Sequence, residues 1–82
     1  PEVIFEILSP ATASKDRNLK FDLYEREGVQ YYVIVDPETQ MAKVYQRFTD
    51  GRFVKQLDVQ KQTFLFDLGE CQIDFDFSLI WS

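Results

Sequence analysis

The sequence predicts an α/β (α+β) fold with a mixed β-sheet, in which one βαβ unit is followed by antiparallel hairpins. Residues 3–8 and residues 31–35 are two nearly continuous apolar runs, which are typical of strands buried on both faces. Residues 14–27 lie between them with the spacing of a helix and are followed by Gly28, a residue favoured just past a helix end. The segments after residue 35 alternate apolar with polar residues and are separated by turn residues, as antiparallel strands do.

The first apolar run contains one residue that breaks its pattern. Glu6 is the only charged side chain in residues 3–8, so it is expected inside the sheet. An ionised carboxylate in apolar surroundings is costly, and it requires a cation, a metal ion or a raised pKa. A strand buried on both faces also needs a neighbour on each side. We therefore expect a further strand from sequence before Pro1, which would make this chain an N-terminally truncated fragment.

The predicted helix places one lysine and one aspartate on its buried side. At about 100° per residue, the buried arc is defined by four apolar or aromatic side chains: Leu19, Phe21, Leu23 and Tyr24. Asp16 and Lys20 fall within this arc, so Lys20 is the candidate cation for Glu6. The opposite, solvated face carries polar side chains: Asn18, Asp22, Glu25 and Arg26. Two interpretations remain, a functional site or a structural ion pair with an ordinary i,i+4 contact between Asp16 and Lys20.

The segments after the helix predict the rest of the sheet. A strand–helix–strand unit of about 35 residues predicts parallel strands joined by a right-handed crossover. Asp36 and Pro37 open a type I turn, and residues 41–48 and 52–59 are expected to form a hairpin around residues 49–51. In the first strand Ala42, Val44 and Phe48 are expected on one side, with Lys43 and Arg47 on the other. In the second strand Phe53, Leu57 and Val59 are expected to share a face.

A second pair of strands is predicted at residues 63–68 and 71–77. Phe64, Phe66 and Leu68 share one face of the first strand, and Cys71, Ile73, Phe75 and Phe77 share one face of the second. Asp74 and Asp76 could be taken for a metal site, but period-two spacing more simply gives them the solvent-exposed face. Residues 78–81 are expected to form a terminal turn that lays apolar side chains on the core.

Composition limits the class of function. The 82 residues are expected to form a single domain, residues 1–82, and a net charge of −5 disfavours tight nucleic-acid binding by this stretch alone. The charge does not exclude a nuclease, because carboxylates that hold a metal are themselves acidic. With no histidine and Cys71 as the single cysteine, a zinc site and an internal disulfide are not expected. A metal would be a hard, oxygen-liganded ion such as Mg²⁺ or Mn²⁺.

Three stretches of the sequence resemble one bacterial family. Residues 1–12, PEVIFEILSPAT, resemble the signature PDLVVEVLSPST, and Asp16, Lys20 and Tyr24 match its D-x3-K-x3-Y spacing. Residues 28–37, GVQYYVIVDP, resemble GVxEYWIVDP. These motifs are those of the Uma-type restriction endonucleases, a family in the PD-(D/E)xK nuclease superfamily. The resemblance covers essentially the whole chain, is specific over residues 1–37 and is looser in the tail.

The resemblance implies a restriction-endonuclease-like core, of which this chain would be the C-terminal part. It implies hydrolysis of DNA phosphodiesters with Mg²⁺ or Mn²⁺, in the cytoplasm and in a homodimer. Glu6 would be the acidic metal ligand on the central strand, the Ile7 carbonyl a backbone ligand, and Lys20 the lysine that acts on the attacking water. The superfamily motif places that lysine where this chain has Leu8, and here it would come from the helix instead. Asp16 would position Lys20 or ligate the metal.

One departure affects the activity expected of the fragment. The superfamily's first aspartate lies on the preceding strand, outside these residues, and Glu2 is a poor substitute for it. The fragment alone is therefore expected to be inactive. The alternative is a non-catalytic restriction-endonuclease-like scaffold or interaction domain with Glu6 and Lys20 as a structural pair. A third reading, a small interaction module, would need an exposed apolar patch or a bare sheet edge.

Overall fold

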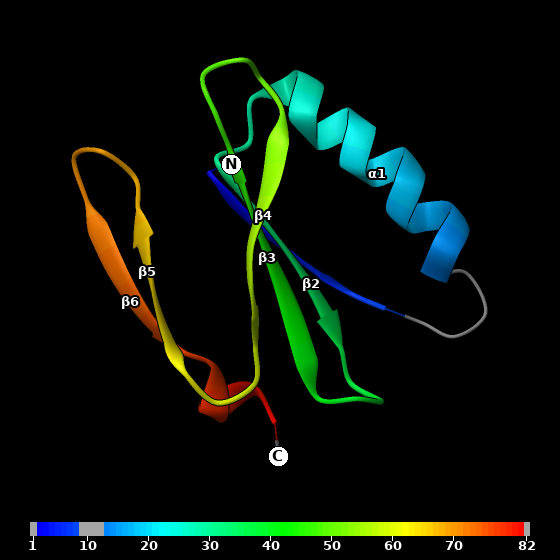
Figure 1. The fold of residues 1–82 in the computed structure, drawn as a ribbon, viewed down its shortest axis with the longest axis vertical. Coiled ribbons are helices and arrows are strands. Elements are labelled where there is room, and N and C mark those ends of the chain that lie inside the picture. Colours follow the sequence, from blue (N-terminus) through cyan, green and yellow to red (C-terminus); the bar gives the residue numbers. More distant parts are fainter. Residues whose placement is uncertain (1, 9–12, 82) are drawn as a thin grey trace.

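The computed structural model confirms the predicted fold class. It describes residues 2–8 and 13–81, and the side chains of all of these except residues 13–18. In chain order the elements are β1 (Val3–Ile7), α1 (Ala13–Glu27), β2 (Tyr31–Asp36), β3 (Met41–Arg47), β4 (Phe53–Val59), β5 (Thr63–Asp67), β6 (Gln72–Asp76) and a 3₁₀ helix (Phe77–Ile80). Four strands form a mixed sheet in the order β1-β2-β3-β4, and β5 and β6 form a separate antiparallel pair (Figure 1).

The βαβ unit and the hairpins lie where the sequence predicts them. β1 and β2 are parallel, whereas β2–β3, β3–β4 and β5–β6 are antiparallel. The helix ends before Gly28, whose φ of 78° lies in the left-handed region that favours glycine. Among the described residues, no helix is long and apolar enough to cross a membrane.

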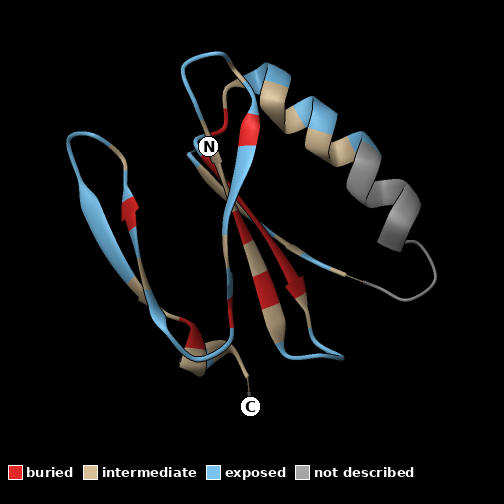
Figure 2. Cartoon of the chain, viewed as in Figure 1, coloured by how far each residue is buried: buried red, intermediate tan, exposed pale blue. Residues whose placement is uncertain are grey.

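The four-stranded sheet has two different faces, because side chains alternate along each strand. Tyr31, Val33 and Val35 of β2 point to the side covered by β5 and β6, which we call the hairpin face. Tyr32 and Ile34 point to the side covered by α1, which we call the helix face. All five of these residues are buried, and Figure 2 shows β2 as the most continuously buried strand.

The larger core lies on the hairpin face. Its buried residues are Tyr31, Val33, Val35, Ala42, Val44, Val59, Phe66 and Phe77. The rings of Phe66 and Tyr31 pack edge-on with centroids 5.0 Å apart, and the Tyr31 hydroxyl donates to the Asp67 carbonyl. The predicted inward side of the β5 strand is therefore confirmed. The 3₁₀ helix contributes Phe77, and Ile80 and Trp81 pack against the same core.

The first strand differs from its prediction. Within the described residues β1 pairs only with β2 and forms an edge of the sheet, so it is not an interior strand there. Phe5 and Ile7 are 40% and 68% exposed. The strand is apolar because both of its faces are partly covered. The Phe5 ring contacts Phe75 on the hairpin face, and Ile4 packs against the core on the helix face.

The prediction that Phe53, Leu57 and Val59 share one face of β4 is also wrong in part. Leu57 and Val59 belong to the core on the hairpin face, but Phe53 belongs to the core on the helix face. The cause is a register shift: Val44 pairs with Leu57 and Tyr45 with Lys55, which leaves Gln56 as an extra residue in β4. Such a bulge reverses the alternation on one side of it. Phe48 lies past the end of β3 and is 46% exposed.

Candidate functional site

Glu6 and Lys20 meet on the helix face of the sheet. Glu6 of β1 is the register partner of Ile34, and because its side chain has the same orientation it faces α1. Lys20 extends from the middle of α1, and its Nζ donates to Glu6 Oε1 at 2.5 Å. The predicted contact is therefore present. The Lys20 and Glu6 side chains are 37% and 22% exposed, so the pair is accessible from solvent and not enclosed.

The face of α1 that reaches the sheet is narrower than predicted. Leu19 and Leu23 are 63% and 38% exposed, so they do not define the buried arc. Phe21 and Tyr24 do, since both pack into the core on the helix face. The Tyr24 ring lies edge-on to Tyr32, with centroids 5.2 Å apart. The side chain of Asp16, predicted to position Lys20 or ligate metal, lies outside the described residues.

Glu25 was assigned to the solvated side of the helix, and this assignment is wrong. Its carboxylate Oε2 accepts the backbone N–H of Phe53 at 2.6 Å, and its carbonyl accepts the Arg47 Nε–H at 3.3 Å. Glu25 therefore joins the C-terminal end of α1 to β3 and β4. No local sequence pattern predicts these contacts, because they depend on how the helix is placed over distant strands.

The backbone carbonyl of Ile7 lies at the open edge of the sheet. The Leu8 N–H donates to the Val35 carbonyl, and the Tyr31 N–H donates to the Glu2 carbonyl. Glu2 and Leu8, an even number of positions apart, therefore turn their backbone groups toward β2. These groups alternate in direction along a parallel strand. The N–H and C=O of Ile7 therefore point away from β2, to a side on which no described residue pairs with β1.

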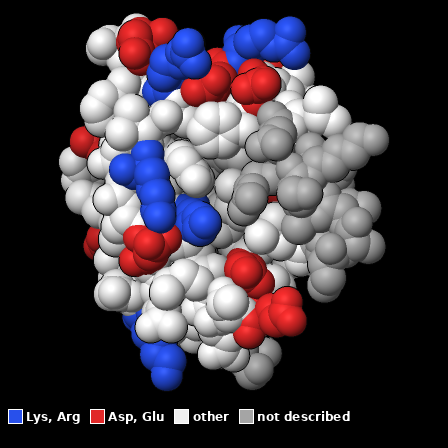
Figure 3. Space-filling view, turned by 45° about the vertical axis from the view of Figure 1, so that its right-hand side comes forward, with Lys and Arg blue, Asp and Glu red and all other residues white. Residues whose placement is uncertain are grey.

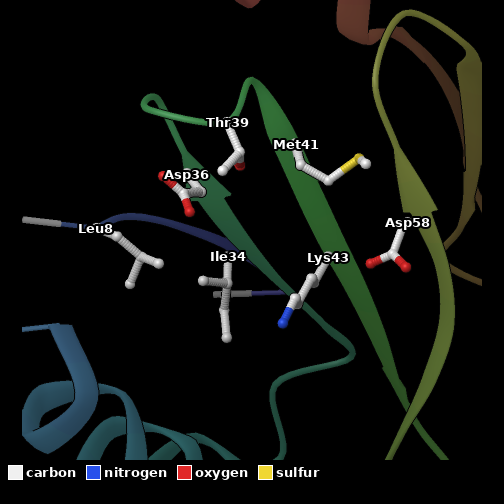
Figure 4. Close-up of a pocket in the computed structure, with 7 residues that line it drawn as sticks. All are labelled: Leu8, Ile34, Asp36, Thr39, Met41, Lys43 and Asp58. Carbon is white, nitrogen blue, oxygen red and sulfur yellow. The ribbon is translucent and has the colours of Figure 1, made fainter.

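A pocket continues the helix face away from Glu6 and Lys20. It has a volume of about 350 Å³ and is lined by Leu8, Ile34, Asp36, Thr39, Met41, Lys43 and Asp58 (Figure 4). Ile34, which lines the pocket, is the register partner of Glu6. Across the strands the register runs from Glu6 to Ile34, then to Lys43 and Asp58, so these residues form one row. Alternation along β3 predicts that Lys43 and Ala42 point to opposite faces of the sheet. The pairing of Lys43 with Ile34 and Asp58 depends on strand register, which the sequence does not show.

The donor atoms fit part of a magnesium site. The described residues contain no group of three His, Cys, Asp or Glu side chains that could hold a metal. The Glu6 carboxylate and the Ile7 carbonyl nevertheless come from adjacent residues at one sheet edge, and both are hard oxygen donors. Mg²⁺ commonly takes one or two carboxylates and keeps several waters. These two donors are therefore chemically suited to one side of a hydrated ion.

The two acidic residues of β6 have different surroundings. Asp74 is exposed. Asp76 Oδ1 accepts the N–H and the hydroxyl of Ser78, at 2.9 and 2.6 Å, and thereby caps the 3₁₀ helix. These hydrogen bonds stabilise the carboxylate and hold the pKa of Asp76 below its ordinary value.

Charged side chains are mixed on the visible part of the surface. In Figure 3 the basic residues lie in separate patches, and acidic residues lie beside them in the described part of that face. This pattern agrees with the net charge of −5. Any contact with a polyanion on this side would therefore depend on individual cations and not on a continuous basic band.

Comparison with known proteins identifies the family. Residues 1–72 match the protein-family model Uma2, described as "Putative restriction endonuclease". No curated protein matches the chain. The matched part includes β1, α1 and β2, and therefore both members of the Glu6–Lys20 pair as well as Ile7 and Lys43. Because the match extends over most of the 82 residues, the chain belongs to the Uma2 family of restriction endonuclease-like proteins.

Proposed function

We propose that this chain carries part of the active site of a metal-dependent endonuclease that hydrolyses DNA phosphodiester bonds. The observation that supports this most directly is the Lys20–Glu6 contact of 2.5 Å at a sheet edge that also presents the Ile7 carbonyl. It joins a carboxylate and a carbonyl, which can hold a divalent ion, to an ammonium group, which can stabilise negative charge on a phosphoryl oxygen.

Glu6 and Ile7 are the proposed ligands of Mg²⁺ or Mn²⁺. A bound divalent ion would lower the pKa of a coordinated water and offset the charge that develops on the phosphoryl oxygens. The partial exposure of Glu6 leaves its carboxylate reachable from solvent. The lysine beside it does not prevent ion binding, because Lys20 sits on a flexible four-carbon stem.

Lys20 is the proposed catalytic cation. Its ammonium is held beside Glu6 and would donate a hydrogen bond to the attacking water or to a non-bridging phosphoryl oxygen. In the reaction the water oxygen forms a bond to phosphorus, one P–O ester bond breaks, and the departing oxygen takes a proton. In-line attack of this kind depends on orienting groups, and α1 supplies one of them from outside the sheet.

Nicking of supercoiled plasmid DNA by the full-length protein tests the proposal. We expect nicking in Mg²⁺ or Mn²⁺, none in EDTA, none for Glu6→Gln, and a lower rate for Lys20→Met with little change in the metal concentration required. Glu38→Gln removes the same charge from the exposed turn after β2 and should behave like wild type. If Glu6→Gln and Lys20→Met nick as fast as wild type, this site assignment is wrong.

A non-catalytic scaffold is the alternative that the same experiment decides. It would be favoured if folded protein never nicks DNA and if neither Mg²⁺ nor Mn²⁺ changes its thermal unfolding. The proposal also includes a homodimer, in which two copies of the site would cut the two strands of a duplex. Light scattering of the full-length protein, with and without duplex DNA, measures that state.

A further inference from the structure

We propose that Lys43 binds a DNA phosphate that flanks the scissile one, in the pocket beside the Glu6–Lys20 pair. The inference rests on the proposed function, since it gives the same substrate a second point of contact. It assigns to the pocket a ligand class, a phosphodiester, and to Lys43 the role of a positioning residue.

The register places Lys43 at a suitable distance from the candidate active site. Glu6 pairs with Ile34, and Ile34 pairs with Lys43, so two strand spacings separate Glu6 from Lys43. At about 4.8 Å for each spacing, their Cα atoms lie about 10 Å apart on the same face of the sheet. One DNA strand carries a phosphate for about every 3.4 Å of helix axis. A strand with its scissile phosphate at Glu6 would therefore bring another phosphate, within about three nucleotides, to Lys43.

Lys43 supplies the positive charge among the residues that line the pocket. Among the described residues its ammonium takes part in no ion pair or hydrogen bond, although it is half-buried. Asp58, its cross-strand neighbour, instead pairs with Lys55 at 2.9 Å. Figure 4 shows the Lys43 side chain running alongside Ile34, with its ammonium turned away from Asp58.

The pocket lining combines apolar side chains with two carboxylates, Asp36 and Asp58, each of which already has a partner. The Asp36 carboxylate is engaged by the backbone N–H of Glu38 at 3.0 Å, in the turn after β2. Ile34, Leu8 and Met41 supply an apolar lining. Charge interactions strengthen where apolar groups replace water, so a phosphate held there by Lys43 gains more than one held by an exposed lysine.

Duplex binding in a Glu6→Gln background tests the inference without cleavage. We expect Lys43→Met to weaken binding about tenfold, the loss of one charge-assisted contact, and to lower the salt slope by about 0.9. Lys43→Arg should retain most of the affinity and shows that loss of charge, not misfolding, is responsible. Lys61→Met is the matched control, because Lys61 is an exposed lysine in the turn between β4 and β5.

A scan with neutral methylphosphonates identifies the phosphate itself. One substitution within about three nucleotides of the cut should weaken binding of the Lys43 protein and cause no further loss in Lys43→Met. The inference is wrong if Lys43→Met binds DNA as tightly as Lys61→Met. It is also wrong if every methylphosphonate weakens binding of Lys43→Met as much as it weakens binding of the Lys43 protein. Both outcomes count against it even when Glu6-dependent nicking is present. If the wild type neither binds nor nicks DNA, both the inference and the proposed function are wrong.

Discussion

The two faces of the four-stranded sheet are built from the same strands but differ in what covers them. The hairpin face is closed by β5, β6 and the 3₁₀ helix over a core of eight buried residues. The helix face has a smaller core of four buried residues, centred on Tyr32 and Phe53, and next to it lie the Glu6–Lys20 pair and a pocket of about 350 Å³. One face is filled with apolar side chains, while the other keeps its charged groups accessible.

The difference separates the part of the molecule that supplies most of the stability from the part that carries the proposed site. Hydrophobic burial supplies most of the favourable free energy of folding, and here the larger share lies on the hairpin face. Ionisable groups contribute little to stability when they stay half-exposed, but they must stay accessible to bind a substrate. In the part of the chain that the structure describes, α1 is the helix that lies over this face, and the Glu6–Lys20 pair stays partly exposed beside it.

The largest effect is expected from the hairpin face. Phe77→Ala removes a fully buried ring, and it should lower the free energy of unfolding by about 3–5 kcal/mol. Leu79→Ala, in the same 3₁₀ helix but 78% exposed, should change it by less than about 0.5 kcal/mol. Urea denaturation measures both. Equal losses in the two variants would show that the hairpin face does not hold the main core.

A smaller effect is expected where the helix is attached. Glu25→Ala leaves the Phe53 N–H without its carboxylate acceptor and should cost about 1–3 kcal/mol. Glu25→Gln retains an acceptor oxygen and should recover most of this loss, while Glu27→Ala at the exposed helix end should cost little. Urea denaturation again gives the values. A Glu25→Ala protein as stable as wild type would mean that this contact does not hold α1 on the sheet.

A still smaller effect is expected from the Glu6–Lys20 pair. Because the two side chains are 22% and 37% exposed, losing either partner should cost only about 1 kcal/mol. A fully buried pair would cost about 3–5 kcal/mol when broken. Comparing Glu6→Gln, Lys20→Met and the double variant by urea denaturation measures the coupling. A large loss for each single variant, restored in the double, would favour a structural role for the pair.

The smallest effect is a change in acid titration on β6, outside both compared faces. Ser78→Ala removes one hydrogen bond that lowers the pKa of Asp76, so that pKa should rise toward the ordinary value. With its folded pKa below the unfolded one, Asp76 stabilises the fold above the unfolded pKa of about 3.9, and this is lost as pH falls through the folded pKa. NMR titration of the carboxyl carbon measures the shift. Identical titration in both proteins would contradict it.

The elements and the main contact of the site could be predicted from the sequence. Two apolar runs, a helical spacing and Gly28 were enough for the βαβ unit, because these signals are local. Lys20 lay in the predicted buried arc, and the structure places its ammonium against Glu6. The prediction succeeded although Leu19 and Leu23 are exposed, since Lys20 lies on the same side of the helix as Tyr24.

The features that were missed depend on pairing between distant strands. The register alone places Lys43 beside Ile34, and only the placement of α1 brings Glu25 to Phe53. The edge position of β1 was hidden because an apolar strand looks interior whether or not it has a second neighbour. The functional roles of Glu6, Ile7, Lys20, Asp16 and Tyr24 stay predictions that the proposed experiments address.

The extra residue in β4 lets a single strand serve two cores. Val59 and Leu57 are committed to the hairpin face, and beyond Gln56 the strand turns Phe53 to the rings under the helix. Leu57 and Phe53 are four positions apart, so an uninterrupted strand would turn both to the same face of the sheet. The bulge at Gln56 changes this and gives each of them a different core, so straightening the bulge without removing a residue would disturb the helix face even though β4 lies far from Glu6 in the sequence.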